Sequence, residues 1–280
     1  MTITKAVKTK QKLKLLIEAA SGGGKTFSAL RLAKGLVGER GKVVVLDTEN
    51  GSASLYADRF DFYTVELKPP FSPQNYLLKI DEIEQFGADV CIIDSMSMIW
   101  SGQGGCLDMQ TALGGRFQDW AKVTPLYEKF MNRILQSPMH IICTARTKSD
   151  WSMDKDEKGK TVVQKLGLKT EARDGTDYTF TTVFRLNQNH IATVSKDRTS
   201  LFEDMQEMIT EETGKKFIKW LNDGETPKKP DIHNHFGKKI AECNTLEELV
   251  KLYNDNPKEA EEYKVLFTNR KEVLEKAKGE

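Results

Sequence analysis

The stretch Ala20-Ser21-Gly22-Gly23-Gly24-Lys25-Thr26 decides the fold of this chain. It follows an apolar run, residues 13–17, and it precedes a helical pattern that begins at Phe27. A strand, a glycine-rich turn, Lys-Thr and a helix, in this order, form a phosphate-binding P-loop. Backbone N–H groups of the turn and of the helix N-terminus would hold the phosphate oxygens. The order of elements therefore predicts a site for a phosphate-bearing ligand.

Two side chains of this loop have expected tasks. Lys25 would reach the β- and γ-phosphates of a nucleotide, and the Thr26 hydroxyl would hold Mg²⁺. The usual motif has a glycine where this chain has Ala19, so only its GKT half is conventional. A glycine-rich turn without function is the alternative, and the flanking strand and helix argue against it. The predicted nucleotide-binding residues are Ser21, Gly22, Gly23, Gly24, Lys25, Thr26 and Phe27.

Composition places the chain among soluble globular proteins. Its 280 residues suit one large α/β domain with an appendage, and 39% of them are hydrophobic. No stretch approaches the roughly 20 apolar residues of a membrane span, so no membrane association is expected. The net charge of +1 gives no global basic field for nucleic acid. Scattered cysteines without zinc-ligand spacing, and no signal-peptide core, predict a reducing, cytoplasmic setting, which is the host cytoplasm if the gene is phage-encoded.

Apolar runs alternate with helical patterns along most of the chain, which predicts a central, mostly parallel sheet. Two alternating runs, 178–186 and 190–196, suggest antiparallel strands that extend this sheet. Residues 100–116 contain five glycines and predict a loop, or a loop with a short helix. The buried strands are expected at 13–19, 42–46, 90–93 and 140–144, and the main helices at 25–37, 73–86, 123–136 and 214–221.

The chain divides by composition into four parts. The lysines of the N-terminal arm could contact phosphates or an acidic neighbour, or simply be solvated. Near the other end, Thr245 and Glu248 form a capping box, and a last helix is expected from about Pro257 to Lys276. Its apolar side would be Tyr263, Leu266, Phe267 and Leu274. The expected parts are a basic arm (1–12), a P-loop domain (13–224), a linker (225–230) and a small C-terminal helical segment (231–280).

Polar residues follow the third predicted strand, at the edge where a parallel sheet places its ligand. Four apolar residues followed by Asp94 form the Walker B pattern. Its carboxylate would bind a water of the Mg²⁺ ion and help to orient Thr26. An aspartate that only caps the next helix is the alternative.

Hydrolysis also needs a group that orients or deprotonates the attacking water. Asp94 is followed by Ser95, so the adjacent glutamate of many ATPases is absent. Glu49, at the end of the neighbouring predicted strand, is the best candidate for this role, and Asp47 is the alternative.

Several of these segments resemble a known family. Leu46-Asp47-Thr48-Glu49, with Leu55-Tyr56-Ala57 downstream, is similar to the second-strand segment of RecA-type recombinases. Ile92-Ile93-Asp94-Ser95 resembles the Walker B motif of the same family. The resemblance implies that Glu49 activates water. It also places Arg146 where RecA has a glutamine that senses the γ-phosphate, and arginine is a competent phosphate ligand.

One further segment, Ser195-Lys196-Asp197-Arg198-Thr199, resembles the K-x-R element of hexameric helicases and RadA-type proteins. In those proteins it enters the ATP site of the neighbouring subunit, where two cations would stabilise transition-state charge. A solvated loop is the alternative. The resemblance thus completes a predicted catalytic set of Lys25, Glu49, Asp94, Arg146, Lys196 and Arg198.

The whole order of motifs, over about residues 12–205, looks most like the compact RecA-like ATPases of bacteriophage recombination modules. The fold class that follows is α/β, a RecA-like P-loop NTPase core with an antiparallel extension and a small C-terminal helical appendage. The resemblance implies ATP and Mg²⁺ as cofactors, a homo-oligomer in ring or filament form, and single-stranded DNA as partner. A single-strand-binding or other replication or recombination protein is a further possible partner.

Two segments, about 100–122 and 147–176, match loops that face the DNA in RecA proteins. The second is rich in lysine and contains Trp151, which could stack on a base. Acidic residues dilute its charge, so an ordinary solvated insertion remains an alternative. The expected DNA contacts are Lys148, Trp151, Lys158, Lys160 and Lys165.

Three functions compete on this evidence. The first is an oligomeric ATPase that acts on single-stranded DNA and is stimulated by it. The second is a helicase-type DNA motor, against which the short chain argues. The third is a P-loop enzyme unrelated to nucleic acid, such as a small-molecule kinase, against which the K-D-R-T segment argues. The absence of an N-K-x-D motif from the sequence argues against a GTPase.

Overall fold

A computed structural model describes residues 7–155, 161–224, 236–257, 260 and 263–276 of the chain. The chain divides into two compact units, residues 1–225 and 226–280. Among the described residues, no helix combines the length and apolarity that crossing a membrane would need. The linker predicted at 225–230 lies outside the described residues.

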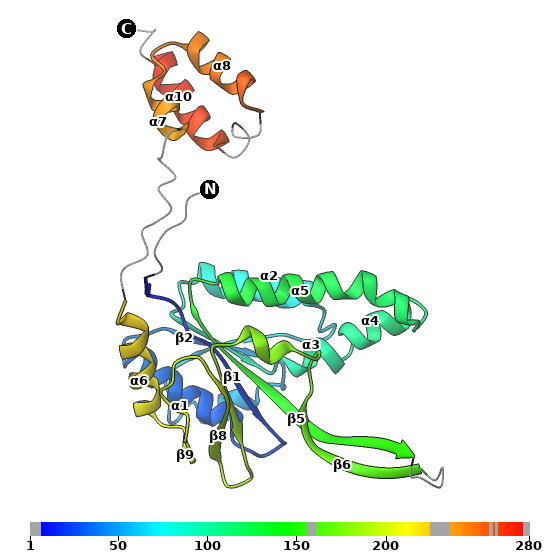
Figure 1. The fold of residues 1–280 in the computed structure, drawn as a ribbon. Helices are drawn as coiled ribbons and strands as arrows, with labels where there is room; N and C mark the ends of the chain where they lie inside the picture. The colour runs from blue at the N-terminus through cyan, green and yellow to red at the C-terminus, as the bar shows by residue number, and fades with distance from the viewer. Residues whose placement is uncertain (1–6, 156–160, 225–235, 258–259, 261–262, 277–280) are drawn as a thin grey trace. The chain divides into compact units, whose positions relative to one another are not determined.

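The larger unit is built on a sheet that has nine strands among the described residues (Figure 1). Its order is β3-β2-β4-β5-β1-β7-β8-β9, and β6 pairs with β5. All pairs from β3 through β7 are parallel, whereas β8 and β9 add antiparallel strands. This confirms the predicted fold class. The strands are β1 (Lys14–Ala19), β2 (Val43–Asp47), β3 (Tyr63–Glu66), β4 (Val90–Asp94), β5 (His140–Lys155), β6 (Thr161–Thr170), β7 (Thr182–Leu186), β8 (Ile191–Asp197) and β9 (Glu207–Met208).

Helices cover both faces of this sheet (Figure 1). Side chains alternate along β1, so Leu16 enters one hydrophobic core while Leu15 and Ile17 enter the other. The first core lies under α2 and α5, and the second lies under α1 and α6. The helices are α1 (Lys25–Val37), α2 (Pro73–Gln85), α3 (Ser97–Ser101), α4 (Cys106–Ala112), α5 (Trp120–Gln136) and α6 (Glu211–Asn222), with a 3₁₀ turn, η1 (Ser52–Tyr56).

Helices α1 and α6 pack unusually closely because glycines face each other. A Cβ at Gly35 would lie 1.9 Å from the carbonyl oxygen of Glu211, and one at Gly214 would lie 2.3 Å from that of Leu32. Only glycine fits at both positions. Helix α1, which carries Lys25 of the P-loop, is thus fixed against α6.

The structure contains one strand and one strand pairing that the sequence did not predict. Strand β3 was not predicted, because Tyr63–Glu66 is a mostly exposed edge strand without an apolar run. Strands β7 and β8 pair antiparallel with each other, as expected, and β7 also pairs with β1 in parallel. Alternation of side chains reports a strand but not its direction, which here follows from pairing with β1.

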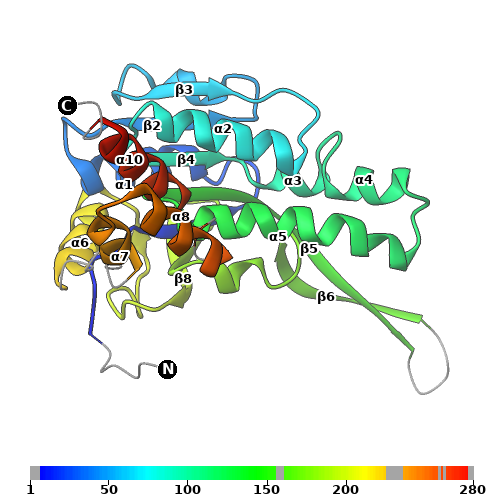
Figure 2. The same ribbon diagram turned by 90° about the horizontal axis from the view of Figure 1, so that it is seen from above.

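The fourth predicted strand is also much longer than expected. Strand β5 continues past Thr144 to Lys155 and pairs antiparallel with β6, from Thr147 opposite Thr170 to Lys155 opposite Thr161. Seen from above, this hairpin extends beyond the rest of the sheet (Figure 2). Residues 156–160, between the two strands, lie outside the described residues.

The described part of the N-terminal arm packs on α6. The Lys8 ammonium lies 4.3 Å from the centroid of the Trp220 ring and 3.6 Å from the Asp223 carboxylate. A cation that rests on an aromatic face beside a carboxylate is held by both. For Lys8, the structure therefore shows a contact with an acidic neighbour, which was one of the alternatives predicted for the N-terminal arm.

The smaller unit contains α7 (Phe236–Glu242), α8 (Leu246–Asp255) and α10 (Lys264–Lys276) around a core that includes Leu249, Phe267 and Leu274. The predicted capping box is present, since Glu248 N–H donates to Thr245 Oγ1 over 3.2 Å. Pro257 and Ala260 are helical, as predicted, but a turn at Tyr263 separates them from α10, which begins at Lys264. The apolar side was predicted correctly, because Tyr263 and Leu266 pack against the same core.

Stability should depend on pH through His140, at the start of β5. Burial, followed by the charges of Lys12 and Lys14, lowers the pKa of His140 to about 4. Its Nδ1 accepts a hydrogen bond from Leu13 N–H over 3.0 Å, which requires that nitrogen to be unprotonated. The unfolded chain takes up this proton near pH 6.5, so the contribution is full above that pH and is lost toward pH 4.

From pH 7 to pH 5 we expect His140 to reduce the free energy of unfolding by about 2 kcal/mol. Urea unfolding of the wild type and of His140→Gln at both pH values measures this contribution. The variant should lose that part of the pH dependence, because glutamine can accept the same N–H without titrating. Equal pH dependence in the two proteins would contradict the assignment.

Candidate nucleotide-binding site

The P-loop connects β1 to α1 at the carboxyl edge of the parallel sheet. Gly22 and Gly24 have φ values of +76° and +80°, which favour glycine. A Cβ at Gly23 would lie 2.6 Å from that of Ala19. The three glycines are therefore required by the backbone of the turn. Ala19, in place of the usual first glycine, is simply the buried last residue of β1.

Lys25 opens α1 and lies folded over the loop. Its Nζ donates to the carbonyl oxygens of Ala19 and Ala20 over 3.4 and 3.2 Å. Burial lowers the pKa of Lys25, while the nearby carboxylates Asp94 and Glu49 act in the opposite direction. These are long bonds to neutral acceptors, so phosphate oxygens would be better partners for the same cation.

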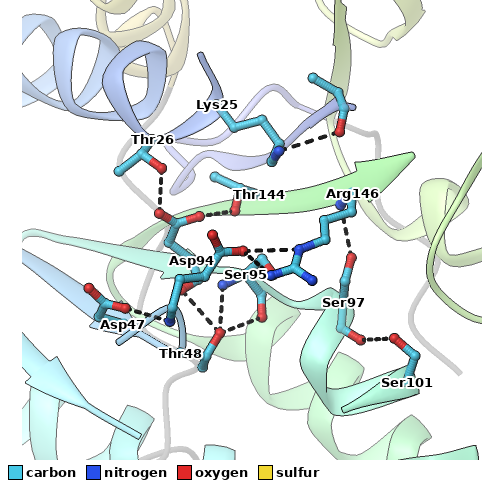
Figure 3. Close-up of polar contacts among 12 residues, drawn as sticks. Lys25, Thr26, Asp47, Thr48, Asp94, Ser95, Ser97, Ser101, Thr144 and Arg146 are labelled. Atoms are coloured by element: carbon cyan, nitrogen blue, oxygen red, sulfur yellow. Dashed lines mark hydrogen bonds and ion pairs between the residues drawn. The ribbon is translucent and has the colours of Figure 1, made fainter. Parts of the chain in front are cut away.

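Asp94 ends β4 and is 1% exposed. Its carboxylate accepts hydrogen bonds from the Thr26 hydroxyl, over 2.6 Å, and from the Thr144 hydroxyl at the neighbouring strand (Figure 3). Burial raises the pKa of Asp94, and the two hydroxyl bonds oppose that shift. Hard oxygen donors from Thr26 and Asp94 are the ligand type that suits Mg²⁺.

Thr48 ties the end of β2 to the end of β4 (Figure 3). Its N–H donates to the Asp94 carbonyl over 2.8 Å, and its hydroxyl accepts from Ser95 N–H over 2.9 Å. The Tyr76 hydroxyl of α2 donates to the Ser95 carbonyl over 2.9 Å. Thr48 and Tyr76 were not predicted as parts of the site. Only the proximity of Thr48 to Glu49 could have drawn attention to the first of them.

Asp47 does not face the ligand. It is 1% exposed, and its two oxygens accept from Glu49 N–H, over 2.6 Å, and from Ala53 N–H, over 3.2 Å. These bonds shape the loop after β2, and Asp47 is not among the residues that line the pocket described below, whereas Glu49 is. Of the two carboxylates considered for water activation, the geometry favours Glu49.

Glu49 forms an ion pair with Arg146, which lies next to Ala19 in the register of β5 with β1. Glu49 Oε1 lies 2.9 Å from Nη2 and 3.2 Å from Nε of Arg146. The Arg146 N–H donates to Ser97 Oγ over 2.9 Å, which fixes its backbone (Figure 3). Both side chains are partly exposed and line the same pocket as Lys25. The sequence predicted both residues but not their contact.

The P-loop forms one wall of a pocket of about 660 Å³, within the size range of ligand sites. The Phe27 ring lies edge-on to Tyr56, with centroids 5.5 Å apart, and the guanidinium groups of Arg31 and Arg59 lie 5.8 and 5.9 Å from its centroid. Flat apolar rings beside the phosphate site can receive a nucleobase. The other pocket residues that the sequence analysis did not assign include Ser28, Ser52, Leu55, His190, Met208 and Ile209.

Lys196 and Arg198 are not brought to this pocket. They lie at the end of β8, where Arg198 N–H donates to the Thr181 carbonyl and Thr181 N–H donates to that of Lys14. Lys14 begins β1, whereas the P-loop follows its last residue. The two cations therefore lie at the opposite edge of the sheet from the P-loop of their own chain.

The predicted DNA contacts that the structure describes belong to the β5–β6 hairpin. Lys148 is exposed on β5, opposite Lys169. Trp151 and Lys165 are register partners farther along the hairpin. Lys158 and Lys160 lie outside the described residues.

Replacing Glu49 with glutamine should separate binding from turnover. We expect ATP hydrolysis to fall about 10²- to 10⁴-fold, the usual contribution of a general base. Nucleotide affinity should change little, because the glutamine keeps the shape and the loop bonds of Asp47. Steady-state turnover and fluorescent ADP binding on the same preparations measure both. Near-normal turnover in this variant would remove Glu49 from the mechanism.

The comparison with protein families agrees with this site. A family model described as an AAA domain matches residues 11–219, which is more than half of the chain. The chain therefore belongs to this AAA-domain family of P-loop NTPases and has the core of a nucleotide-binding ATPase. The comparison with curated proteins found no match.

Proposed function

We propose that this chain is a RecA-like ATPase that acts on single-stranded DNA as a homo-oligomer in phage recombination or replication. Each ATP site would be completed by Lys196 and Arg198 of a neighbouring copy. One observation carries the proposal: the phosphate site lies at one edge of the sheet, and this pair of cations lies at the other edge.

Carbonyl oxygens of their own chain hold the two cations side by side, so that they could enter the ATP site of a neighbouring copy together. Lys196 Nζ donates to the carbonyls of Asp177 and Tyr178 over 2.9 and 2.8 Å, and Arg198 donates to the latter over 3.1 Å. Partial burial and the charge of Arg198 lower the pKa of Lys196. A head-to-tail contact that joins opposite edges of identical sheets generates a ring or a filament. Such a contact would add positive charge at the γ-phosphate, as an arginine finger does.

ATP and Mg²⁺ fit the groups on the other edge. Lys25 and the loop amides would hold the phosphates, Thr26 would bind the metal, and Asp94 would bind it through water. The ion would neutralise charge on the phosphates. Among the described residues, no cluster of three or more His, Cys, Asp and Glu side chains could hold a metal ion. We therefore expect Mg²⁺ to bind together with the nucleotide.

The β5–β6 hairpin supports the assignment of DNA as partner. It starts directly after Arg146, whose side chain lines the pocket, and Glu171 N–H, after β6, donates to the Arg146 carbonyl over 2.7 Å. Exposed Lys148 follows in β5, where it could contact a backbone phosphate. A ligand that moves this hairpin would act on the pocket through Arg146. DNA bound to the hairpin could stimulate ATP hydrolysis by this route.

ATP hydrolysis with and without single-stranded DNA, with the mass measured by light scattering under the same conditions, tests the proposal. We expect stimulation by the single strand, weaker stimulation by duplex of equal length, and a mass above that of one chain. An active monomer indifferent to DNA would favour a kinase-like enzyme. ATP-dependent strand displacement on a forked duplex would favour a helicase motor.

A further inference from the structure

A histidine far from the P-loop in sequence lies against it in the structure. His190 belongs to the turn between β7 and β8 and lines the same pocket as Lys25. A Cβ added to Gly24 would lie 2.7 Å from His190 Nδ1, which is closer than any side chain could be. The imidazole therefore rests directly on the backbone of Gly24.

The turn is built in a way that fixes this position. Asn187 Oδ1 accepts from the N–H groups of Asn189 and Ile191 over 2.9 and 3.0 Å, and His190 N–H donates to the Asn187 carbonyl over 3.0 Å. His190 has a φ of +64°, a conformation that histidine tolerates better than most residues. Parallel pairing of β7 with β1 brings the turn to the edge that carries the P-loop.

The chemistry of the ring suits the ligand of this loop. The amides of a P-loop gather around a phosphate chain, so a group that rests on Gly24 lies beside the phosphates. Lys25 and Arg31 enter the pocket from α1, and Arg146 enters from β5. His190 comes from a third element and carries a ring N–H that can donate to a phosphate oxygen.

We propose that His190 is a nucleotide contact, donating a hydrogen bond to the phosphate chain held by the P-loop. This inference rests on the ATPase function proposed above and adds a binding residue to it. The contact exists in the ground state as well as during turnover. It therefore contributes to the affinity for ADP and for ATP and to KM, but little to kcat.

Three variants test the contact. His190→Asn keeps a residue suited to the left-handed turn, but its shorter side chain holds the N–H donor farther from the phosphates, and His190→Gln restores an N–H at similar reach. Asn189→Ser, in the same turn and not part of the pocket lining, is the control. Binding of a fluorescent ADP analogue and the KM and kcat for ATP are measured, with the Tm of the nucleotide-free protein as a check on folding.

We expect His190→Asn to weaken ADP binding and raise KM about tenfold, as loss of a hydrogen bond to a charged group does, with kcat within about twofold. His190→Gln should recover most of the affinity, and Asn189→Ser should match the wild type. Unchanged ADP affinity in His190→Asn would overturn the contact alone. So would a lower Tm in both His190 variants together with no recovery of ADP affinity in His190→Gln. A wild-type protein that binds neither ADP nor ATP would overturn the proposed ATPase as well.

Discussion

The Lys25→Ala variant is expected to be inactive, with ATP turnover below about one-thousandth of the wild-type rate. The alanine removes the cation that would stabilise the negative charge on the β- and γ-phosphates during the reaction. Folding should survive, because burial disfavours the charge of Lys25 and its bonds to Ala19 and Ala20 are long. Turnover and Tm measured on the same preparation separate the two effects.

Lys34→Ala is the matched control for this substitution. Lys34 lies in the same helix but at its other end, paired with Glu39 and Glu211. Its loss should leave turnover close to that of the wild type. If Lys25→Ala hydrolysed ATP at the wild-type rate, the pocket at the P-loop would not be the site of hydrolysis.

Lys196→Ala and Arg198→Ala should each lose turnover about 10³-fold or more, the range found for an arginine finger supplied in trans. Both variants should still bind ADP normally, since the two cations lie at the edge of the sheet opposite their own P-loop. Turnover and ADP affinity are the measurements.

Thr193→Ala, on the same strand β8, controls for disturbance of the strand. Thr193 is exposed, and its hydroxyl donates only a 3.3 Å bond to the Arg185 carbonyl. That variant should remain active. Full turnover by both cation variants would exclude a role for this edge in hydrolysis.

The local parts of the site could be predicted from the sequence. The glycine turn, Lys25 and Thr26 lie next to one another between a strand and a helix, and Asp94 directly follows an apolar strand. Short-range patterns of this kind determine both the local backbone conformation and the functional groups that it presents. The mostly parallel sheet followed from the same alternation of elements.

Contacts between distant segments could not be predicted in this way. The sequence left Glu49 and Asp47 as alternatives, and only the bonds from the backbone to Asp47 distinguish them. The ion pair of Glu49 with Arg146 depends on the order β2-β4-β5 in the sheet and on the registers of these strands. His190 reaches Gly24 only because β7 pairs in parallel with β1, and the sequence did not predict that pairing.

The central claim is that one ATP site takes residues from two copies of the chain. Mixing Lys25→Ala with the double variant Lys196→Ala/Arg198→Ala tests it most directly. Each protein alone should be inactive. A 1:1 mixture should regain roughly a quarter of the wild-type rate, because random head-to-tail assembly pairs an intact P-loop with intact cations at that frequency. A mixture that stays as inactive as its components at every ratio, while it assembles like the wild type, would contradict the claim.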